Sequence, residues 1–196
     1  MKYFFILGLG RSGTKFLAKT LNSINGFTVL HEPYIDDSLI LNYSYIGEEF
    51  KTVIDNELSK RFSLMSKQIS PSTLTYGEAN SYLRFNGKWL RENLNAKVFY
   101  IVRNGKDYLK SAYARDIYTP FESQLSIVPK DRDDFSRVWY KMSRFEKICW
   151  YWMSTNEYLY NCSNGNIIHF ESLLTSYEYF NRKLLKPLAI TSFSKN

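Results

Sequence analysis

Short, continuous apolar runs alternate along this chain with longer segments in which apolar residues recur every three or four positions. Runs of the first kind are typical of strands buried on both faces of a parallel sheet, and segments of the second kind are typical of amphipathic helices. The expected strands are residues 3–7, 27–30, 73–76, 98–102 and 167–170, and the expected helices are residues 14–21, 48–67, 81–94, 106–115, 134–160 and 173–185.

Strands that alternate with helices predict an α/β domain of three layers, with a parallel central sheet flanked by helices. The arrangement we expect is P-loop-like, because a glycine-rich loop follows the first predicted strand and leads into the first predicted helix. The 196 residues are enough for one domain of ordinary size, so we expect residues 1–196 to form a single domain. Segment 117–133 contains two prolines and mixed charges, which favours a loop that could act as a flap.

The formal net charge of +7 suits an anionic substrate or cofactor. Lys and Arg are spread among acidic residues and form no basic run, so we expect no nucleic-acid partner.

Cys149 and Cys162 stand too far apart along one predicted helix to bridge, which favours a reducing compartment and a cytoplasmic location. The apolar run 3–7 predicts a buried strand and not a signal peptide, and we expect no membrane span.

The loop after the first predicted strand, residues 8–15, reads GLGRSGTK. A glycine-rich turn before a helix offers backbone N–H groups to a phosphate. Compared with the Walker A pattern GxxxxGK[ST], Gly8 and Gly13 keep their places. Thr14 stands where the lysine belongs, and Lys15 stands where the magnesium-binding hydroxyl belongs. The loop therefore predicts a phosphate site without magnesium, and the alternative is a tight turn that binds nothing.

A second cationic site follows the strand predicted at residues 98–102. Arg103 ends this strand, at a point where a P-loop nucleotide enzyme can carry a metal-binding Asp. Ser111 lies eight positions later, on the same face of the next predicted helix as Asp107 and Arg115. Taken alone, Arg103 is better explained as a solvated charge at the end of a strand. Together with Ser111 and the first loop it predicts a phosphate site, with charge-assisted bonds of about 1.5–3 kcal/mol each.

These two motifs resemble those of the PAPS-dependent sulfotransferase family, in its carbohydrate and bacterial branch. The segment RSGT at residues 11–14 is similar to the family's 5′-phosphosulfate loop, and Arg103 and Ser111 keep the spacing of its 3′-phosphate motif. The usual proline after this arginine motif is replaced by Gly105. The resemblance implies that the donor PAPS (3′-phosphoadenosine 5′-phosphosulfate) is bound, without a metal, by Arg11, Ser12, Gly13, Thr14, Lys15, Phe16, Arg103 and Ser111.

The resemblance extends from Tyr3 to about Leu185. Residues 168–173, IHFESL, are similar to the family's late strand and the acidic turn after it, and we expect Glu171 to cap the following helix. The family then has a basic, glycine-containing loop that closes over the 3′-phosphate and adenine. We find no such loop before Asn196, which predicts either a truncated sequence or a weaker grip on the cofactor.

The resemblance implies sulfuryl transfer from PAPS to a hydroxyl or amine of a sugar or small metabolite. Lys15 is expected to stabilise the departing phosphate. The base belongs at the end of the second predicted strand, where His31 and Glu32 stand and where Pro33 biases Glu32 to an extended backbone. Carbohydrate-type members use a Glu at the matching place, so Glu32 is the expected base and His31 its alternative. Glu78 is a weaker candidate, for acceptor contact.

Two other functions remain open. A P-loop kinase would be supported by an intact Walker lysine and a metal-binding carboxylate, and both are missing. A nucleotide-binding module that has lost catalysis is the second alternative. We assign acceptor selectivity to segments 34–75 and 117–133, and we expect the helical aromatic residues, Trp139 among them, to lie in the core. Neither the acceptor nor the oligomeric state is predicted.

Overall fold

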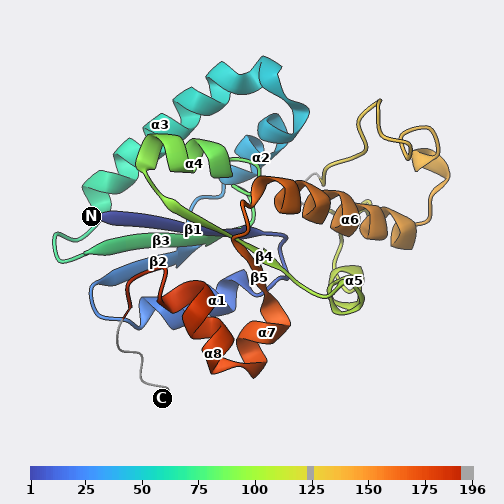
Figure 1. Ribbon diagram of the computed structural model, residues 1–196. Helices are drawn as coiled ribbons and strands as arrows, with labels where there is room; N and C mark the ends of the chain where they lie inside the picture. Colours follow the sequence, from blue (N-terminus) through green and yellow to red (C-terminus); the bar gives the residue numbers. More distant parts are fainter. Residues whose placement is uncertain (123–125, 191–196) are drawn as a thin grey trace.

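In the computed structural model, which describes residues 1–122 and 126–190, one central sheet of five parallel strands carries helices on both faces (Figure 1). The strand order is β2-β3-β1-β4-β5, so the first strand lies in the middle of the sheet. The predicted three-layer α/β fold is therefore confirmed. The strands are β1 (Lys2–Gly8), β2 (Phe27–His31), β3 (Thr75–Asn80), β4 (Lys97–Val102) and β5 (Ile167–His169).

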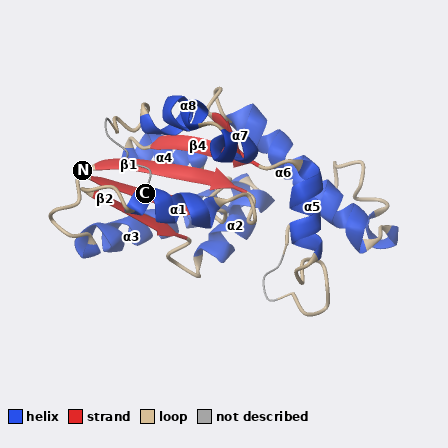
Figure 2. Ribbon diagram, turned by 90° about the horizontal axis from the view of Figure 1, so that it is seen from below, coloured by secondary structure: helices blue, strands red, loops and turns tan. Residues whose placement is uncertain are grey.

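The helices form two layers and an extension. On one face of the sheet lie α1 (Thr14–Asn22), α7 (Phe170–Thr175) and α8 (Tyr177–Phe180), and on the other lie α3 (Lys51–Gln68) and α4 (Gly87–Leu94). Helix α5 (Gly105–Tyr113) packs on α6 (Arg144–Cys162), and both extend past the carboxyl ends of the strands, close to α2 (Asp37–Ile46) (Figures 1 and 2). Short helical turns are η1 (Glu48–Phe50), η2 (Trp139–Lys141) and η3 (Asn181–Leu185).

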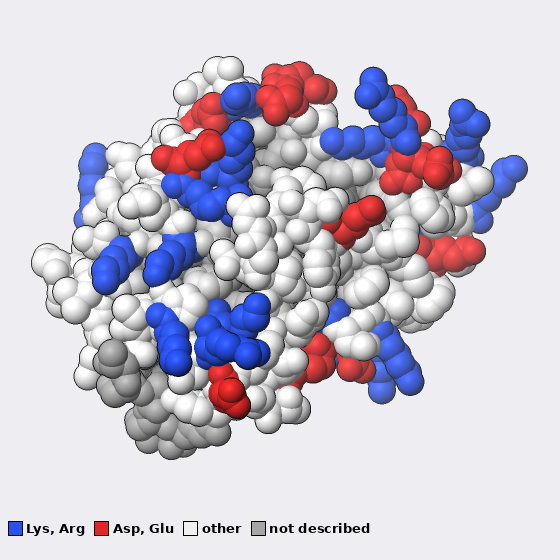
Figure 3. All heavy atoms as spheres, viewed as in Figure 1, with Lys and Arg blue, Asp and Glu red and all other residues white. Residues whose placement is uncertain are grey.

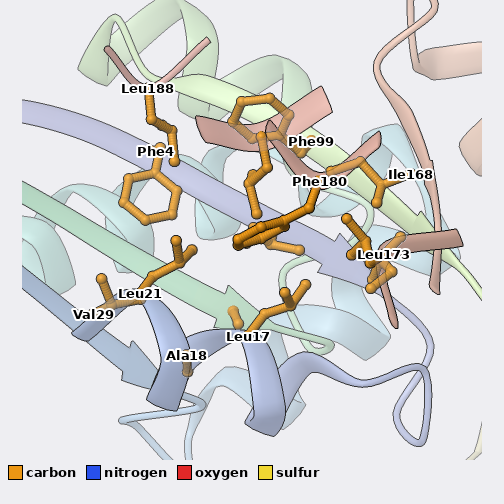
Figure 4. Packing of buried hydrophobic residues seen from close by; sticks show 14 of the residues in the cluster. Phe4, Leu17, Ala18, Leu21, Val29, Phe99, Ile168, Leu173, Phe180 and Leu188 are labelled. Carbon is orange, nitrogen blue, oxygen red and sulfur yellow. The ribbon is translucent and has the colours of Figure 1, made fainter. Parts of the chain in front are cut away.

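The core explains why β1 is apolar along its whole length. Phe4 and Ile6 point into the cluster beneath α1, whereas Phe5 and Leu7 point into the cluster beneath α3. Figure 4 shows the first cluster, in which Phe4 of β1 lies among side chains from α1, β4 and α8. Because successive side chains of a strand face opposite sides, a strand covered on both faces needs apolar residues at every position. None of the helices in the described ranges has the length and apolar character that crossing a membrane requires.

The expected helix at residues 134–160 is wrong in its first part, because α6 begins only at Arg144. A capping box sets this start: Ser143 Oγ accepts from the backbone N of Glu146, and Glu146 Oε2 accepts from the backbone N of Ser143 at 2.7 Å. The preceding apolar residues pack from turns and from η2, where Trp139 is buried as expected. Apolar spacing alone does not distinguish such turns from a helix.

Three further boundaries differ from those expected. Residues 81–86 form a turn and not the start of a helix, because Asn80 Oδ1 accepts from the backbone N of Tyr82 at 2.9 Å and α4 begins at Gly87. The helix expected at residues 173–185 is divided into α7, α8 and η3, since Ser176 caps α8. Helix α2 was not expected, and β3 runs on to Asn80.

Candidate functional site

A cavity of about 580 Å³ lies where the loops after β1, β2 and β3 meet. Parallel sheets bind ligands outside the carboxyl ends of their strands, close to the point where the strand order reverses, and here β1 is that central strand. Most of the residues predicted to bind a ligand or to act on it line this cavity: Arg11, Gly13, Thr14, Lys15, His31, Glu32 and Arg103.

The loop between β1 and α1 forms a cradle for an anion. Gly13 has a φ of 91°, and a Cβ built on it would lie 2.1 Å from the Phe170 ring, so only glycine fits. Helix α1 starts at Thr14 and, within the described residues, no side chain caps its first N–H groups, which the helix itself leaves unpaired. Three of the predicted cofactor residues are not among the described lining residues. Ser12 is buried, Phe16 packs edge-on against Phe170, and Ser111 is connected to the lining through its hydrogen bond with Arg11.

Hydrogen bonds join this loop directly to the second predicted motif. Arg103 Nη1 donates to the carbonyl of Arg11 at 2.8 Å, and Arg11 Nε donates to Ser111 Oγ at 3.1 Å. The Arg11 side chain therefore lies with Ser111 and not over the loop to which its sequence position assigned it. Arg103 Nε is buried and has no hydrogen-bond partner in the described part of the chain. Arg11, Arg103 and Ser111 of the predicted cofactor site therefore lie together, and the N–H at Nε of Arg103 has no acceptor among the described residues.

The end of β4 is held in place from two sides. Trp152 Nε1 donates to the carbonyl of Arg103 at 3.1 Å, and Asn104 caps α5 by accepting from the backbone N of Lys106 at 3.0 Å. Glu171 Oε1 accepts from the backbone N of Asn104 at 2.9 Å. The expectation that Glu171 caps its own helix is therefore wrong. Its carboxylate links α7 to the end of β4, because these two segments lie side by side at the edge of the sheet.

The two candidate bases stand beside the loop, as their place after β2 predicts. His31 Nε2 lies 3.1 Å from Thr14 Oγ1 and 3.9 Å from Glu32 Oε1. Ser81, just after β3, donates to the same Glu32 oxygen from its backbone N at 3.3 Å and also from its hydroxyl. Both bonds engage Oε1, and among the described residues no hydrogen bond reaches Oε2, which is left to accept a proton.

The backbone of Glu32 is not extended, although Pro33 favours that conformation. Its φ is 44°, in the left-handed region. Such a conformation costs about 1–3 kcal/mol and persists only where the surroundings impose it. Here the hydrogen bonds from Ser81 hold the carboxylate toward the cavity. A tertiary contact has therefore overridden the local preference.

Glu78 cannot contact an acceptor. It is fully buried in β3, and both of its oxygens accept hydrogen bonds from Arg61 of α3, at 3.0 and 2.7 Å. Arg61 also binds both oxygens of Asp37 in α2, at 2.6 and 2.7 Å. Burial raises the pKa of Asp37 above its ordinary range, and Arg61 opposes that effect. The role of Glu78 is to anchor α2, which contributes Ser38 and Asn42 to the cavity wall.

The loop predicted as a flap borders the cavity with Ile117, Glu122 and Ser126. Its residues 123–125 lie outside the described residues. The described remainder carries no helix or strand, which confirms the predicted loop. It is attached to α2, because Tyr45 Oη donates to the carbonyl of Val128 at 2.7 Å. The segments to which we assigned acceptor selectivity therefore contact each other at the cavity.

Sequence reasoning missed Ser81 and Arg84, and with them the aromatic wall formed by Tyr108 and Tyr151. Ser81 and Arg84 fell within a predicted helix, where their side chains had no reason to meet the first loop. The available signal was their place a few positions after the strand predicted at residues 73–76, because the carboxyl ends of parallel strands share one edge. Recognising that β3 runs to Asn80 would have brought both residues to that edge.

Cationic side chains outnumber carboxylates in the described lining of the cavity, which includes Arg11, Lys15, Arg84 and Arg103 against Glu32 and Glu122. Over the upper and right-hand parts of the face in Figure 3, basic and acidic side chains are interspersed. The positive charge relevant to a ligand is therefore the local charge inside the cavity, and not the net charge of the molecule. The described residues contain no cluster of His, Cys, Asp and Glu arranged to hold a metal ion.

A comparison with protein-family models finds no match to this chain, and a comparison with curated proteins finds none either. The function must therefore be inferred from the site itself. Its lining combines Arg11, Lys15 and Arg103, which suit an anionic ligand, with the carboxylate of Glu32.

Proposed function

We propose that this chain is a PAPS-dependent sulfotransferase, which transfers a sulfuryl group to a hydroxyl or amine of a sugar or small metabolite. The observation that carries the proposal is the hydrogen-bonded junction of the two cationic motifs, Arg103 to Arg11 and Arg11 to Ser111. PAPS carries two separate anionic groups on one nucleotide, and this junction joins the cationic lining of the cavity, Arg11 and Arg103, to Ser111 beside it.

The residues present fit that donor. The first N–H groups of α1, together with Lys15, would hold the 5′-phosphosulfate. Arg103 and Ser111 would hold the 3′-phosphate, and the unpaired Nε of Arg103 would gain its acceptor. A buried N–H without a partner costs about 1–3 kcal/mol, so a phosphate oxygen there relieves a cost that the free protein bears. When bound, PAPS would supply the sulfuryl group.

The protein's own contribution is positioning, charge stabilisation and proton transfer. Glu32 is the base that takes the proton of the acceptor, because no described residue hydrogen-bonds to its Oε2 while Ser81 fixes the other oxygen. His31 Nε2 lies 3.1 Å from Thr14 Oγ1 and 3.9 Å from Glu32 Oε1, so the imidazole stands between the loop and the carboxylate. Lys15 stabilises negative charge on the loop side of the cavity.

The test is a calorimetric titration with PAP (3′-phosphoadenosine 5′-phosphate), in the presence of a chelator, compared with ATP in the presence of Mg²⁺. We expect PAP to bind without any divalent metal, because the loop lacks the magnesium hydroxyl and Arg103 provides a cation for the 3′-phosphate. Binding of ATP that requires Mg²⁺, together with no binding of PAP, would overturn the proposal in favour of a P-loop kinase.

A further inference from the structure

Arg84 is a buried cation in the cavity wall that is only partly satisfied by the protein. Its side chain is 2% exposed and lines the cavity. Nη1 donates to the carbonyl of Ser81 at 2.7 Å, and Nη2 donates to the hydroxyl of Tyr151 at 2.6 Å. Nε is buried without a partner among the described residues. A guanidinium has five N–H donors, so these two bonds leave most of its donors unused.

The charge of Arg84 is not balanced by its neighbours. Within the described residues no carboxylate forms a salt bridge with it: Glu32 accepts from Ser81, and Glu122 accepts from Tyr118 and Ser126. The phenols of Tyr108 and Tyr118 do not serve as phenolate counter-ions, because burial raises their pKa values well above the ordinary tyrosine value.

Arg61 is a buried arginine with a structural role, and it offers a comparison for the charge partners of Arg84. It is 7% exposed and is paired with Asp37 and with Glu78. Among the described residues Arg84 has neutral partners in place of carboxylates: its two hydrogen-bond acceptors and the aromatic faces of Phe85 and Tyr151, at 5.1 and 5.4 Å from its guanidinium carbon. A buried ion without a counter-ion is costly, and aromatic faces offset only part of that cost. The contrast suggests that the partner of Arg84 comes from outside the chain.

We propose that Arg84 binds an anionic group of the acceptor, so that the substrate is a hydroxyl compound that also carries a carboxylate, sulfate or phosphate. This inference rests on the sulfotransferase function proposed above. The donor's anionic groups are assigned to Arg103, Ser111 and the α1 loop, which leaves Arg84 for the second substrate. Arginine suits this task, since its planar donors match the oxygens of such a group.

Ser81 links this anion site to the proposed base. Its carbonyl accepts from Arg84, while its backbone N and hydroxyl donate to Glu32. An acceptor whose anionic group lies at Arg84 therefore has its neighbouring hydroxyl near Glu32. The Glu32 carboxylate repels the same anionic group, so the two residues together fix the orientation of the acceptor.

The experiment titrates the PAP-saturated chain with glucuronate, glucose 6-phosphate and glucose 6-sulfate, each compared with glucose. We expect at least one anionic sugar to bind about tenfold or more tightly than glucose, as charge-assisted hydrogen bonds provide. Arg84→Gln should abolish that preference and leave the affinity for PAP within about twofold, because this side chain is assigned no contact with the donor. Arg84→Lys, which keeps the charge, should retain part of the preference.

The outcomes separate this inference from the function on which it rests. If PAP does not bind at all, the sulfotransferase proposal fails, whatever the sugars do. If PAP binds but wild-type protein does not distinguish anionic sugars from glucose, the role of Arg84 is overturned and the sulfotransferase stands. Equal loss of PAP and anionic-sugar binding in Arg84→Gln would assign Arg84 to the donor.

If Arg84→Gln does not fold, Tyr151→Phe decides, because it removes the hydroxyl that accepts from Nη2 of Arg84. This variant must weaken the preference for anionic sugars over glucose, and an unchanged preference overturns the inference.

Discussion

Two residues other than glycine adopt a positive φ where the chain enters the cavity, Arg11 at 72° and Glu32 at 44°. Backbone strain of this kind concentrates at functional sites, because the surrounding contacts must impose it. Each residue has such a contact: the carbonyl of Arg11 accepts from Arg103, and the carboxylate of Glu32 accepts from Ser81. At the scale of single residues, tertiary contacts hold Arg11 and Glu32 in strained backbone conformations, and these conformations set the direction of the two side chains.

Glu32→Gln should reduce turnover by about 10²–10⁴-fold while the affinity for PAP stays nearly unchanged. The glutamine keeps the shape and the hydrogen bonds from Ser81 but cannot take a proton. The rate of PAP release in the presence of an acceptor measures the effect. His31→Asn is the matched variant, because His31 is the neighbouring candidate base. An inactive His31→Asn beside an active Glu32→Gln would move the base to His31, and activity in both would exclude the pair.

Gly13→Ala should destabilise the fold much more than Gly165→Ala, although both glycines have a positive φ, 91° and 81°. The backbone penalty for alanine in the left-handed region, about 1–2 kcal/mol, is common to both. Only at Gly13 would the new Cβ collide with the Phe170 ring; nothing among the described residues lies within 4 Å of the Cβ at Gly165. Denaturant unfolding of the two variants measures the difference, and equal losses would show that Phe170 yields freely.

At the scale of elements, one buried ionic cluster determines where α2 lies. Arg61 of α3 binds Asp37 at the start of α2 and Glu78 in β3, and Asn80 donates to both carboxylates, at 2.8 and 3.0 Å. The cluster holds one arginine against two carboxylates, all of them buried. Helix α2 borders the cavity, so its attachment to the sheet determines the shape of the candidate acceptor site.

Asp37→Asn should make the stability of the protein less sensitive to pH above 3.8. Burial raises the pKa of Asp37 above its ordinary value of 3.8. A carboxyl whose pKa rises on folding binds its proton more tightly in the folded state, so its stabilising contribution is full below pH 3.8 and declines as the pH rises through the folded pKa. Asparagine has no such proton but still accepts a hydrogen bond from Arg61.

Urea unfolding over a pH series measures this difference between the wild-type protein and the variant. Asp36→Asn is the control, because Asp36 is exposed next to the cluster and lies outside it. Parallel pH profiles for the wild-type protein and Asp37→Asn would show that Asp37 does not titrate in this range.

At the scale of the whole molecule, the candidate cofactor site is assembled from segments far apart in the chain. Arg11 and Ser111 are 100 positions apart, and Arg11 and Arg103 are 92 apart. The central place of β1 in the sheet makes this possible, since β4 is its direct neighbour and both strands end at the same edge. A ligand that contacts both strand ends would therefore touch residues from the first part of the chain and from its second half.

Arg103→Ala should weaken binding of PAP much more than binding of adenosine 5′-phosphosulfate. Only PAP carries the 3′-phosphate that Arg103 is proposed to hold, and a charge-assisted hydrogen bond contributes about 1.5–3 kcal/mol. Calorimetry with both ligands on the wild-type protein and on the variant gives the comparison. Arg115→Ala, an exposed cation just beyond α5, is the control for loss of positive charge alone. Equal losses for the two ligands in Arg103→Ala would place Arg103 away from the 3′-phosphate.

Local patterns were sufficient to predict that five strands are present, although not where β3 ends, and to predict the loop at residues 8–13 and the place of both candidate bases after β2. Strands β1 and β4 were recognisable because burial on both faces demands a continuous apolar run, which is a property of five or six adjacent residues. The loop was recognisable because a tight turn before a helix requires glycine at particular positions. His31 and Glu32 followed from the rule that the ends of parallel strands share an edge.

What only the tertiary structure decided is the set of contacts between residues that are distant in sequence. Residues 81–86 were predicted as helix although Asn80 holds a turn there, and the contact of Ser81 with Glu32, 49 positions earlier, arises only when β2 and β3 pair. Glu78 became a buried anchor, and Arg84 a cation in the cavity wall, only through Arg61 and Tyr151, 17 and 67 positions away. Periodicity records which face of an element is buried, whereas the charge partner of a buried side chain depends on how the elements pack, and short-range patterns do not contain that information.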